Sequence, residues 1–196
     1  MMPNDKDALP GWFGKLPGMG DFAHRRLPAL FRQGWDDWLH ENLAGLRERH
    51  PDDWTTHYLG SPLWCFMLGP DTVDATAWIG VLMPSVDGAG RYFPLTLARQ
   101  FDTGLDITAW WACAAHIALD ALDADLDAER FEALLARRFD EMDVSGEDAP
   151  PPVGQSSWQA ELKNGTTLRL THAGLPYGVR FDALFGFAPE LLEPLP

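Results

Sequence analysis

A stripe of apolar side chains runs along residues 106–122 with the period of an α-helix. Asp106 stands just before the stripe, where its side chain can cap the first helical turn. Side chains three or four positions apart share one face of a helix, so this face must be covered by another layer. The stripe consists of Ile107, Trp110, Trp111, Ala114, Ile117, Ala118, Ala121 and Leu122. The segment therefore predicts an amphipathic helix packed against a core.

Two further segments have helical spacing. Residues 29–47 carry the first set and residues 127–139 the second. The inward-facing side chains are Phe31, Trp35, Trp38, Leu39 and Leu46 in the first and Phe131, Leu134 and Leu135 in the second. Both segments are predicted to be helices, and residues 179–192 are expected to form a short closing helix or an extended segment.

Short apolar runs bounded by turn residues predict strands at 64–68, 77–83 and 92–98, with a turn cluster at 84–90. Pro94 lies inside the third run and cannot donate a ladder hydrogen bond, so that strand should start after Pro94 or lie at a sheet edge.

The C-terminal third predicts a β-hairpin. Residues 158–162 and 166–171 flank Asn164-Gly165, a pair that tolerates the positive φ of a type I′ turn. Residues 9–28 are rich in Gly and Pro and predict a structured loop or short strand. Residues 140–157 are acidic and Pro-rich, and we expect a mobile loop there.

Interleaved helices and strands without a regular strand–helix–strand rhythm predict an α/β fold, with helices packed on a mixed, partly antiparallel sheet. The chain has 196 residues, 46% of them hydrophobic, which is enough for a core without disulfide or metal. We expect a single domain over residues 1–196.

Charge and apolar patterning exclude several classes of function. The formal net charge is −14, which disfavours binding to nucleic acid and to anionic membranes. No apolar stretch reaches the ~18 residues of a membrane helix, and residues 1–7 do not resemble a signal peptide. Cys65 and Cys113 lie in apolar runs, as expected for free, buried thiols of a reducing compartment. We expect a cytoplasmic protein.

The motifs give no catalytic constellation. Lys15 precedes Gly18 and Gly20, whereas a Walker loop needs the lysine after its glycines. The six histidines have no zinc-binding spacing, there is no GxSxG motif, and no basic neighbour activates Cys65. We therefore expect a protein that is not an enzyme and needs no cofactor. A hydrolase or nucleotide-dependent switch using Lys15 and the loop 84–94 stays an alternative.

The most informative polar side chains lie in Gly- and Pro-rich loops beside aromatic residues. Two interpretations stay open for them: internal ion pairs that brace the loops, or contacts with another protein. Trp12 and Phe13 can likewise belong to the core or anchor an interface. The candidate interaction surface comprises Trp12, Phe13, Lys15, Asp21, Arg25, Arg26, Asp87, Arg91 and Tyr92.

Four blocks of the sequence resemble the TagF/ImpM family of type VI secretion-associated proteins. GLP at 174–176 followed by Phe181 also looks family-like. Two departures stand out, because the family usually has Arg where this chain has Cys65, and Arg-Val where it has Gly88-Ala89. Partner specificity is the property these departures put in question. The blocks are GWFGKLPGMGDFAHRRLP (11–28), WDDWL (35–39), SPLWCFML (61–68) and PSVDGAGRYFPLTLA (84–98).

The resemblance implies more than the residue patterns do. It implies a three-layer αβα sandwich and a stand-alone, non-enzymatic protein that represses type VI secretion after translation. The implied partner is the forkhead-associated scaffold protein of the system, in functional association with a PppA-type phosphatase. The alternative within this setting is a structural component of the secretion apparatus.

Overall fold

The computed structural model describes residues 9–195. The chain divides into two compact units, each built from two separate stretches of sequence. Unit 1 comprises Met1–Leu27 and Ile79–Ala149, and unit 2 comprises Pro28–Trp78 and Pro150–Pro196.

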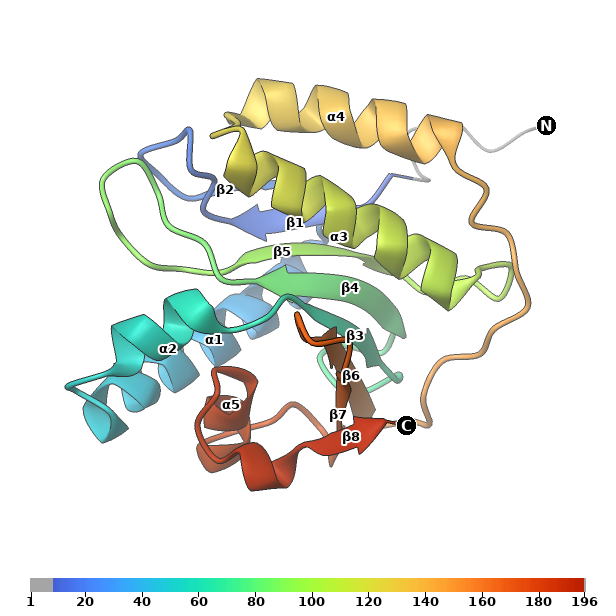
Figure 1. Ribbon diagram of the computed structural model, residues 1–196. Helices are drawn as coiled ribbons and strands as arrows, with labels where there is room; N and C mark the ends of the chain where they lie inside the picture. The colour runs from blue at the N-terminus through green and yellow to red at the C-terminus, as the bar shows by residue number, and fades with distance from the viewer. Residues whose placement is uncertain (1–8, 196) are drawn as a thin grey trace. The chain divides into compact units, whose positions relative to one another are not determined.

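Unit 1 combines four strands with two helices. The strands follow the order β2-β1-β5-β4, and β1 is antiparallel to both of its neighbours. The two helices lie side by side over these strands (Figure 1). The Trp12 ring meets Phe131 edge to face, with centroids 5.4 Å apart, which fixes β1 against the second helix. The elements are β1 (Gly11–Gly14), β2 (Ala23–Arg25), β4 (Trp78–Met83), β5 (Leu95–Gln100), α3 (Ile107–Asp123) and α4 (Ala128–Glu141).

Capping side chains set the starts of both helices in unit 1. The Asp106 carboxylate accepts a hydrogen bond from the Ala109 amide at 2.8 Å, and Asp127 accepts one from the Arg130 amide at 2.9 Å. The buried stripe of α3 includes Trp110, Ala114 and Ile117. The predicted helices over 106–122 and 127–139, and the cap at Asp106, are confirmed.

Pro94 marks the start of β5. The strand begins at Leu95, because proline has no amide hydrogen for the ladder. The Gly- and Pro-rich residues 9–28 form the short strands β1 and β2 with turns between them, as their composition predicts.

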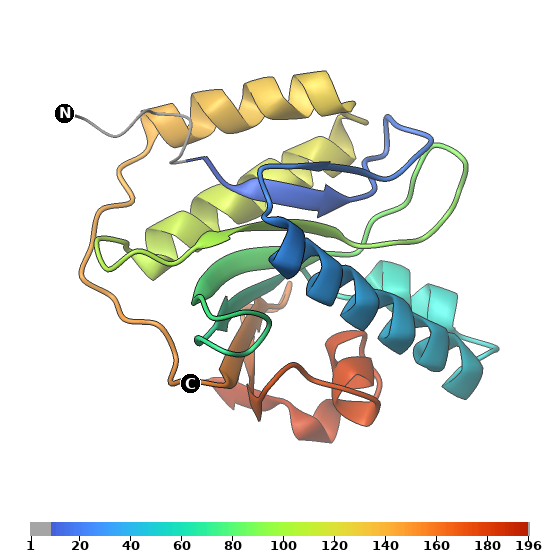
Figure 2. The ribbon, with the colours of Figure 1, turned by 180° about the vertical axis from the view of Figure 1, so that it is seen from behind.

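Unit 2 also has four strands, in the order β3-β6-β7-β8, and the three ladders among them are antiparallel. Its helices α1 and α2 lie side by side (Figure 2). The predicted helix over 29–47, the strand at 64–68 and the closing helix are confirmed. The elements are α1 (Ala29–Arg49), α2 (Trp54–Gly60), β3 (Trp64–Leu68), β6 (Gln155–Glu161), β7 (Thr167–Ala173), α5 (Val179–Leu184), the 3-10 helix η2 (Pro189–Leu191) and β8 (Glu193–Leu195).

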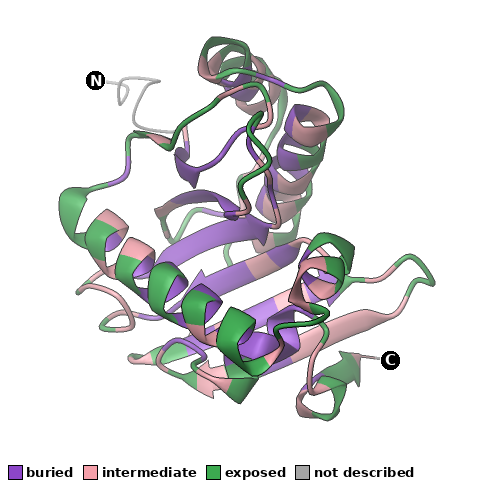
Figure 3. Ribbon diagram, turned by 90° about the vertical axis from the view of Figure 1, so that its left-hand side faces the viewer, coloured by how far each residue is buried: buried purple, intermediate pink, exposed green. Residues whose placement is uncertain are grey.

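Aromatic side chains form the core of unit 2. Trp158 on β6 is buried, and its ring centroid lies 6.2 Å from Trp35 and 5.7 Å from Trp38 on α1. Alternation along β6 places Ser156, Trp158 and Ala160 on this buried face. Figure 3 shows the strands largely buried and the outer faces of the helices exposed.

The hairpin is confirmed, but its turn differs from the predicted type I′. The Gly165 amide donates to the Leu162 carbonyl oxygen at 2.9 Å, and the Leu162 amide donates to the Thr166 carbonyl oxygen at 2.8 Å. Only Gly165 of the Asn-Gly pair has positive φ, at 83°. The connection is therefore a type I turn closed by a glycine in the left-handed region.

Residues 142–154, between α4 and β6, form neither helix nor strand, apart from a bridge between Leu105 and Ser145. The Asp106 amide donates to the Val144 carbonyl oxygen at 2.8 Å, and the Gly146 amide to the Gly104 carbonyl oxygen at 3.0 Å. The expected mobility of 140–157 and the single domain over 1–196 stay predictions.

Both units combine antiparallel strands with helices, which confirms the predicted α/β class and its sandwich of helices on a sheet. No helix within residues 9–195 has the length and apolar character to cross a membrane.

Candidate interaction site

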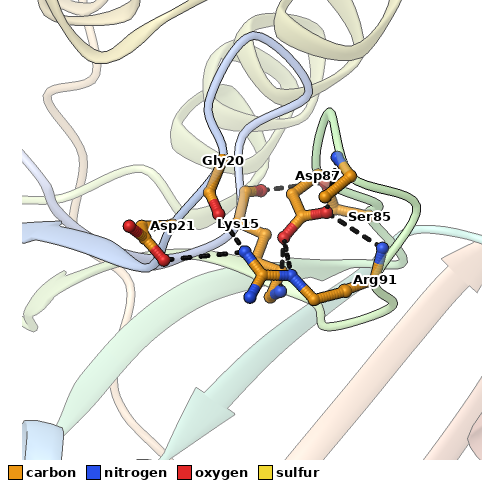
Figure 4. Close-up of polar contacts among 7 residues, drawn as sticks. Lys15, Gly20, Asp21, Ser85, Asp87 and Arg91 are labelled. Atoms are coloured by element: carbon orange, nitrogen blue, oxygen red, sulfur yellow. Dashed lines mark hydrogen bonds and ion pairs between the residues drawn. The ribbon is translucent and has the colours of Figure 1, made fainter.

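Two loops of unit 1 meet beside the end of β1. Residues 15–22 follow β1, and residues 84–94 connect β4 to β5. The Gly88 amide donates to the Met19 carbonyl oxygen at 2.9 Å, and the Ser85 hydroxyl donates to the Lys15 carbonyl oxygen at 2.9 Å. These bonds join the loops before any charged side chain is considered (Figure 4).

The Asp87 carboxylate lies at the centre of this junction. It accepts from Lys15 Nζ at 2.5 Å, from Arg91 Nε at 2.8 Å, and from the Ala89 and Arg91 amides at 3.0 and 2.9 Å. Asp87 and Lys15 are only 4% and 3% exposed. We call Lys15, Asp87 and Arg91 the Asp87 cluster.

Burial and hydrogen bonding oppose each other at Asp87. Burial raises the pKa of the carboxyl, but the bonds from Lys15, from Arg91 and from the Ala89 amide outweigh it and hold the pKa well below its ordinary value. Asp87 is thus a fixed carboxylate whose acceptor sites are occupied, which makes it unsuited to accept a proton from a substrate.

Arg91 extends the Asp87 cluster to the surface. One Nη donates to the Gly20 carbonyl oxygen and lies 3.6 Å from the Asp21 carboxylate. The Arg91 side chain is 54% exposed and that of Asp21 90% exposed. The cluster therefore ends in a charge pair that faces solvent.

A second charged group in unit 1 ties the loop after β2 to α4. The Glu132 carboxylate accepts two bonds from the Arg26 guanidinium, at 2.6 and 3.0 Å, and one from the Trp12 indole. Burial raises the pKa of Glu132, but the bonds from Arg26 and Trp12 together lower it below the ordinary value. Glu132 did not stand out in the sequence, because nothing local to it indicates a partner more than a hundred residues away.

The structure divides the nine predicted surface residues by exposure. It brings Lys15, Asp21, Asp87 and Arg91 together, whereas Arg26 and Trp12 meet at Glu132. The predicted role of all nine in binding stays a prediction. Trp12, Phe13, Lys15 and Asp87 are buried, Tyr92 is half-buried, and Asp21, Arg25, Arg26 and Arg91 are exposed.

Other candidate reactive groups have structural surroundings. Burial raises the pKa of the Cys65 thiol to about 12 and that of Cys113 to about 11, and both thiols are free. His116 on α3 makes a local hydrogen bond, with Nδ1 2.7 Å from the Ala112 carbonyl oxygen. Within residues 9–195, no three His, Cys, Asp or Glu side chains gather in a way that could hold a metal ion.

Two clefts lie away from the joined loops. One of about 650 Å³ is lined by the end of α3 and by α4, including Asp120, Arg130 and Arg137. The other, about 400 Å³ and mainly apolar, lies in unit 2 and is lined by residues that include Trp64 and Leu184.

Unit 2 contains its own buried carboxylate, which sequence reasoning missed. Asp182 on α5 accepts two bonds from the Arg49 guanidinium, both at 2.7 Å, and lies 3.0 Å from His50 Nε2. The Phe187 ring stacks on His50 and on His57, with centroids 3.7 and 4.0 Å apart. We call Arg49, His50 and Asp182 the Asp182 cluster. An acidic residue inside the apolar run FDALF was the signal that could have revealed it.

Fold and site together define an α/β protein in which two joined loops carry a buried ion pair that ends in exposed charges. The family model described as the TagF N-terminal domain, type VI secretion system-associated, matches residues 11–138. This is more than half of the chain, so the chain belongs to this type VI secretion-associated TagF family, as the sequence blocks indicate.

A solved structure supports the same relationship. The crystal structure of PA0076 from Pseudomonas aeruginosa PAO1 is similar to this chain with a TM-score of 0.73 and 28% sequence identity. The similarity covers 90% of this chain and 93% of PA0076. Comparison with curated protein sequences gave no match.

Proposed function

We propose that this protein represses type VI secretion after translation, by binding a component of the system in the cytoplasm without catalysing a reaction. The forkhead-associated scaffold protein is the proposed direct partner, and a PppA-type phosphatase is the proposed functional associate. Membership of the type VI secretion-associated family supports the setting.

The Asp87 cluster is the observation that carries a binding role over a catalytic one. Lys15 and Asp87 are the charged pair that a reaction in these loops would need, and both are buried against each other. A general base must have an accessible oxygen and a pKa near the working pH, and Asp87 has neither. What these loops offer to solvent is Asp21 and Arg91, which are suited to contact another protein.

Deletion of the gene in a strain with an active type VI system tests the proposal. Secretion and sheath assembly are expected to rise, and the wild-type gene supplied in trans is expected to lower them again. Unchanged secretion after deletion would show that repression is the wrong role. Co-purification with the assembled apparatus in constant stoichiometry would instead favour a structural component.

Binding to the purified forkhead-associated scaffold protein tests the partner. Arg91→Ala removes an exposed contact group and is expected to weaken binding, whereas Arg180→Ala removes an exposed arginine of unit 2 and serves as the matched control. Equal binding by both variants would exclude Arg91 from the contact.

A further inference from the structure

Phe22 is an aromatic side chain exposed at the junction of the two loops. Its exposed fraction is 46%, although large aromatic residues of a folded chain are mostly buried. It lies between the loop residues 15–21 and strand β2, directly after Asp21. Phe22 was not among the residues that the sequence singled out.

The surroundings of Phe22 fix its ring in place. The ring packs edge to face on Phe93, with centroids 4.7 Å apart, and stacks on Phe13 at 6.1 Å. Lys15 Nζ lies 4.8 Å from the centre of the same ring, held there by Asp87. An exposed side chain that is ordered before binding loses little conformational entropy when a partner covers it.

Small residues next to the cluster leave room for a partner to approach. Gly20, Gly88, Ala89 and Gly90 are exposed, and a Cβ placed on Gly20 or Gly90 would meet no atom within 4 Å. A bulky surface side chain at these positions would stand in the way of a partner. Aromatic anchors of protein interfaces are typically surrounded by contacts of this undemanding kind.

The exposed charge around Phe22 differs in sign from the rest of the chain. Lys15 is buried against Asp87 and Arg26 is bound to Glu132, so Arg25 and Arg91 are the arginines left with exposed, positively charged side chains here. Asp21 is their acidic neighbour. The whole chain carries a formal net charge of −14, so a local excess of positive charge favours a partner surface with carboxylates.

We propose that Phe22 is the anchor of the partner-binding surface, and that it inserts into an apolar pocket whose rim carries acidic side chains facing Arg25 and Arg91. The inference rests on the proposed function and adds to it the anchoring residue and the chemistry of the partner's surface.

A titration with the purified forkhead-associated scaffold protein as the probe tests the anchor. Phe22→Ala is expected to weaken binding at least about 10-fold, because truncating a central aromatic anchor removes a large share of the binding free energy. Phe22→Leu keeps an apolar group and should retain part of the affinity. The matched control is Tyr177→Ala, which removes an aromatic side chain of similar exposure, 50%, in unit 2.

Salt and charge reversal test the acidic rim. Binding of the wild-type chain should weaken as the salt concentration rises, and Arg25→Glu should weaken binding and flatten this salt dependence. Affinity unchanged in Arg25→Glu would overturn the acidic rim, and affinity unchanged in Phe22→Ala would overturn the anchor. Both results leave the proposed repression standing.

A cellular assay separates failure of the inference from failure of the proposed function. In the deletion strain, the wild-type gene should lower secretion and the Phe22→Ala gene, expressed at an equal level, should not. Equal repression by both refutes the anchor alone. If the scaffold protein does not bind the wild-type chain, this assay decides on Phe22. If the wild-type gene itself fails to repress, the proposed function and the inference fail together.

Discussion

The Asp87 cluster of unit 1 and the Asp182 cluster of unit 2 use the same chemistry in different surroundings. Each places a buried carboxylate between two basic side chains. At Asp87 one of these cations, Lys15, is itself only 4% exposed in its side chain, whereas Arg49 and His50 at Asp182 are 37% and 27% exposed. One cluster is enclosed and shapes a loop surface, while the other stays open to water and fastens α5 to the end of α1.

Burial of the cation decides how much each cluster depends on its carboxylate. A cation left without its partner can be hydrated if it reaches water, but not if it is enclosed. The four predictions that follow sharpen or break this comparison.

Asp87→Ala should have the largest effect on stability. It leaves the buried Lys15 ammonium without a carboxylate, and the melting temperature should fall on the order of 10 °C, as measured by calorimetry. Because charge is then the cause, the double variant Lys15→Met with Asp87→Leu should recover most of the loss. A double variant as unstable as Asp87→Ala would show that shape and not charge matters at this position.

Asp182→Ala should cost less, about 2 kcal/mol in the free energy of unfolding, because Arg49 and His50 can turn to water. Urea denaturation followed by tryptophan fluorescence measures the loss. Glu190→Ala, an exposed acidic residue of the same unit, is the control and should be near neutral. A loss at Asp182 as great as that at Asp87 would break the comparison.

Arg91→Ala should cost only about 1 kcal/mol, since Lys15 and the Ala89 amide still bind the Asp87 carboxylate. The same urea denaturation applies. Arg91→Glu is the poorer variant for binding studies, because it would set a second carboxylate beside Asp87. A large loss of stability in Arg91→Ala would make Arg91 a structural brace first.

The smallest effect concerns pH. The pKa of Asp87 is lower in the folded chain than in the unfolded chain, so the unfolded chain takes up the proton first as pH falls. The stabilisation is complete above the unfolded pKa of about 4 and is lost as pH falls from there toward the folded pKa. The stability difference between wild type and Asp87→Asn should therefore shrink below about pH 4. A difference that stays constant down to pH 2.5 would contradict the enclosed pair.

Local signals in the sequence were sufficient for most elements of the fold. Asp106 begins a helix because its side chain caps the first turn, and Pro94 delays a strand because it has no amide hydrogen. The helix α2 was missed because only Tyr58 in it is buried, so no periodic stripe exists. Strand β8 was missed because three residues that include Pro194 give no strand signal until β7 pairs with them.

The candidate site was predictable only as a set of loops. The sequence indicated Lys15, Asp87 and Arg91 as polar residues among Gly and Pro, and left internal pairing and partner contact both open. Lys15 and Asp87 are 72 positions apart, and only the fold shows that they meet. Phe22 was overlooked because an exposed phenylalanine and a buried one look alike in a sequence.

The division of the chain into interleaved stretches restricts how the protein can be dissected. The backbone passes from one unit to the other after Leu27, Trp78 and Ala149. A fragment ending at residue 138, where the family model stops, would keep α1, α2 and β3 but remove β6, β7 and α5. Such a fragment would expose Trp35 and Trp38 to water and would aggregate for reasons unrelated to secretion. Function is better mapped by point substitutions in the full-length chain than by truncation.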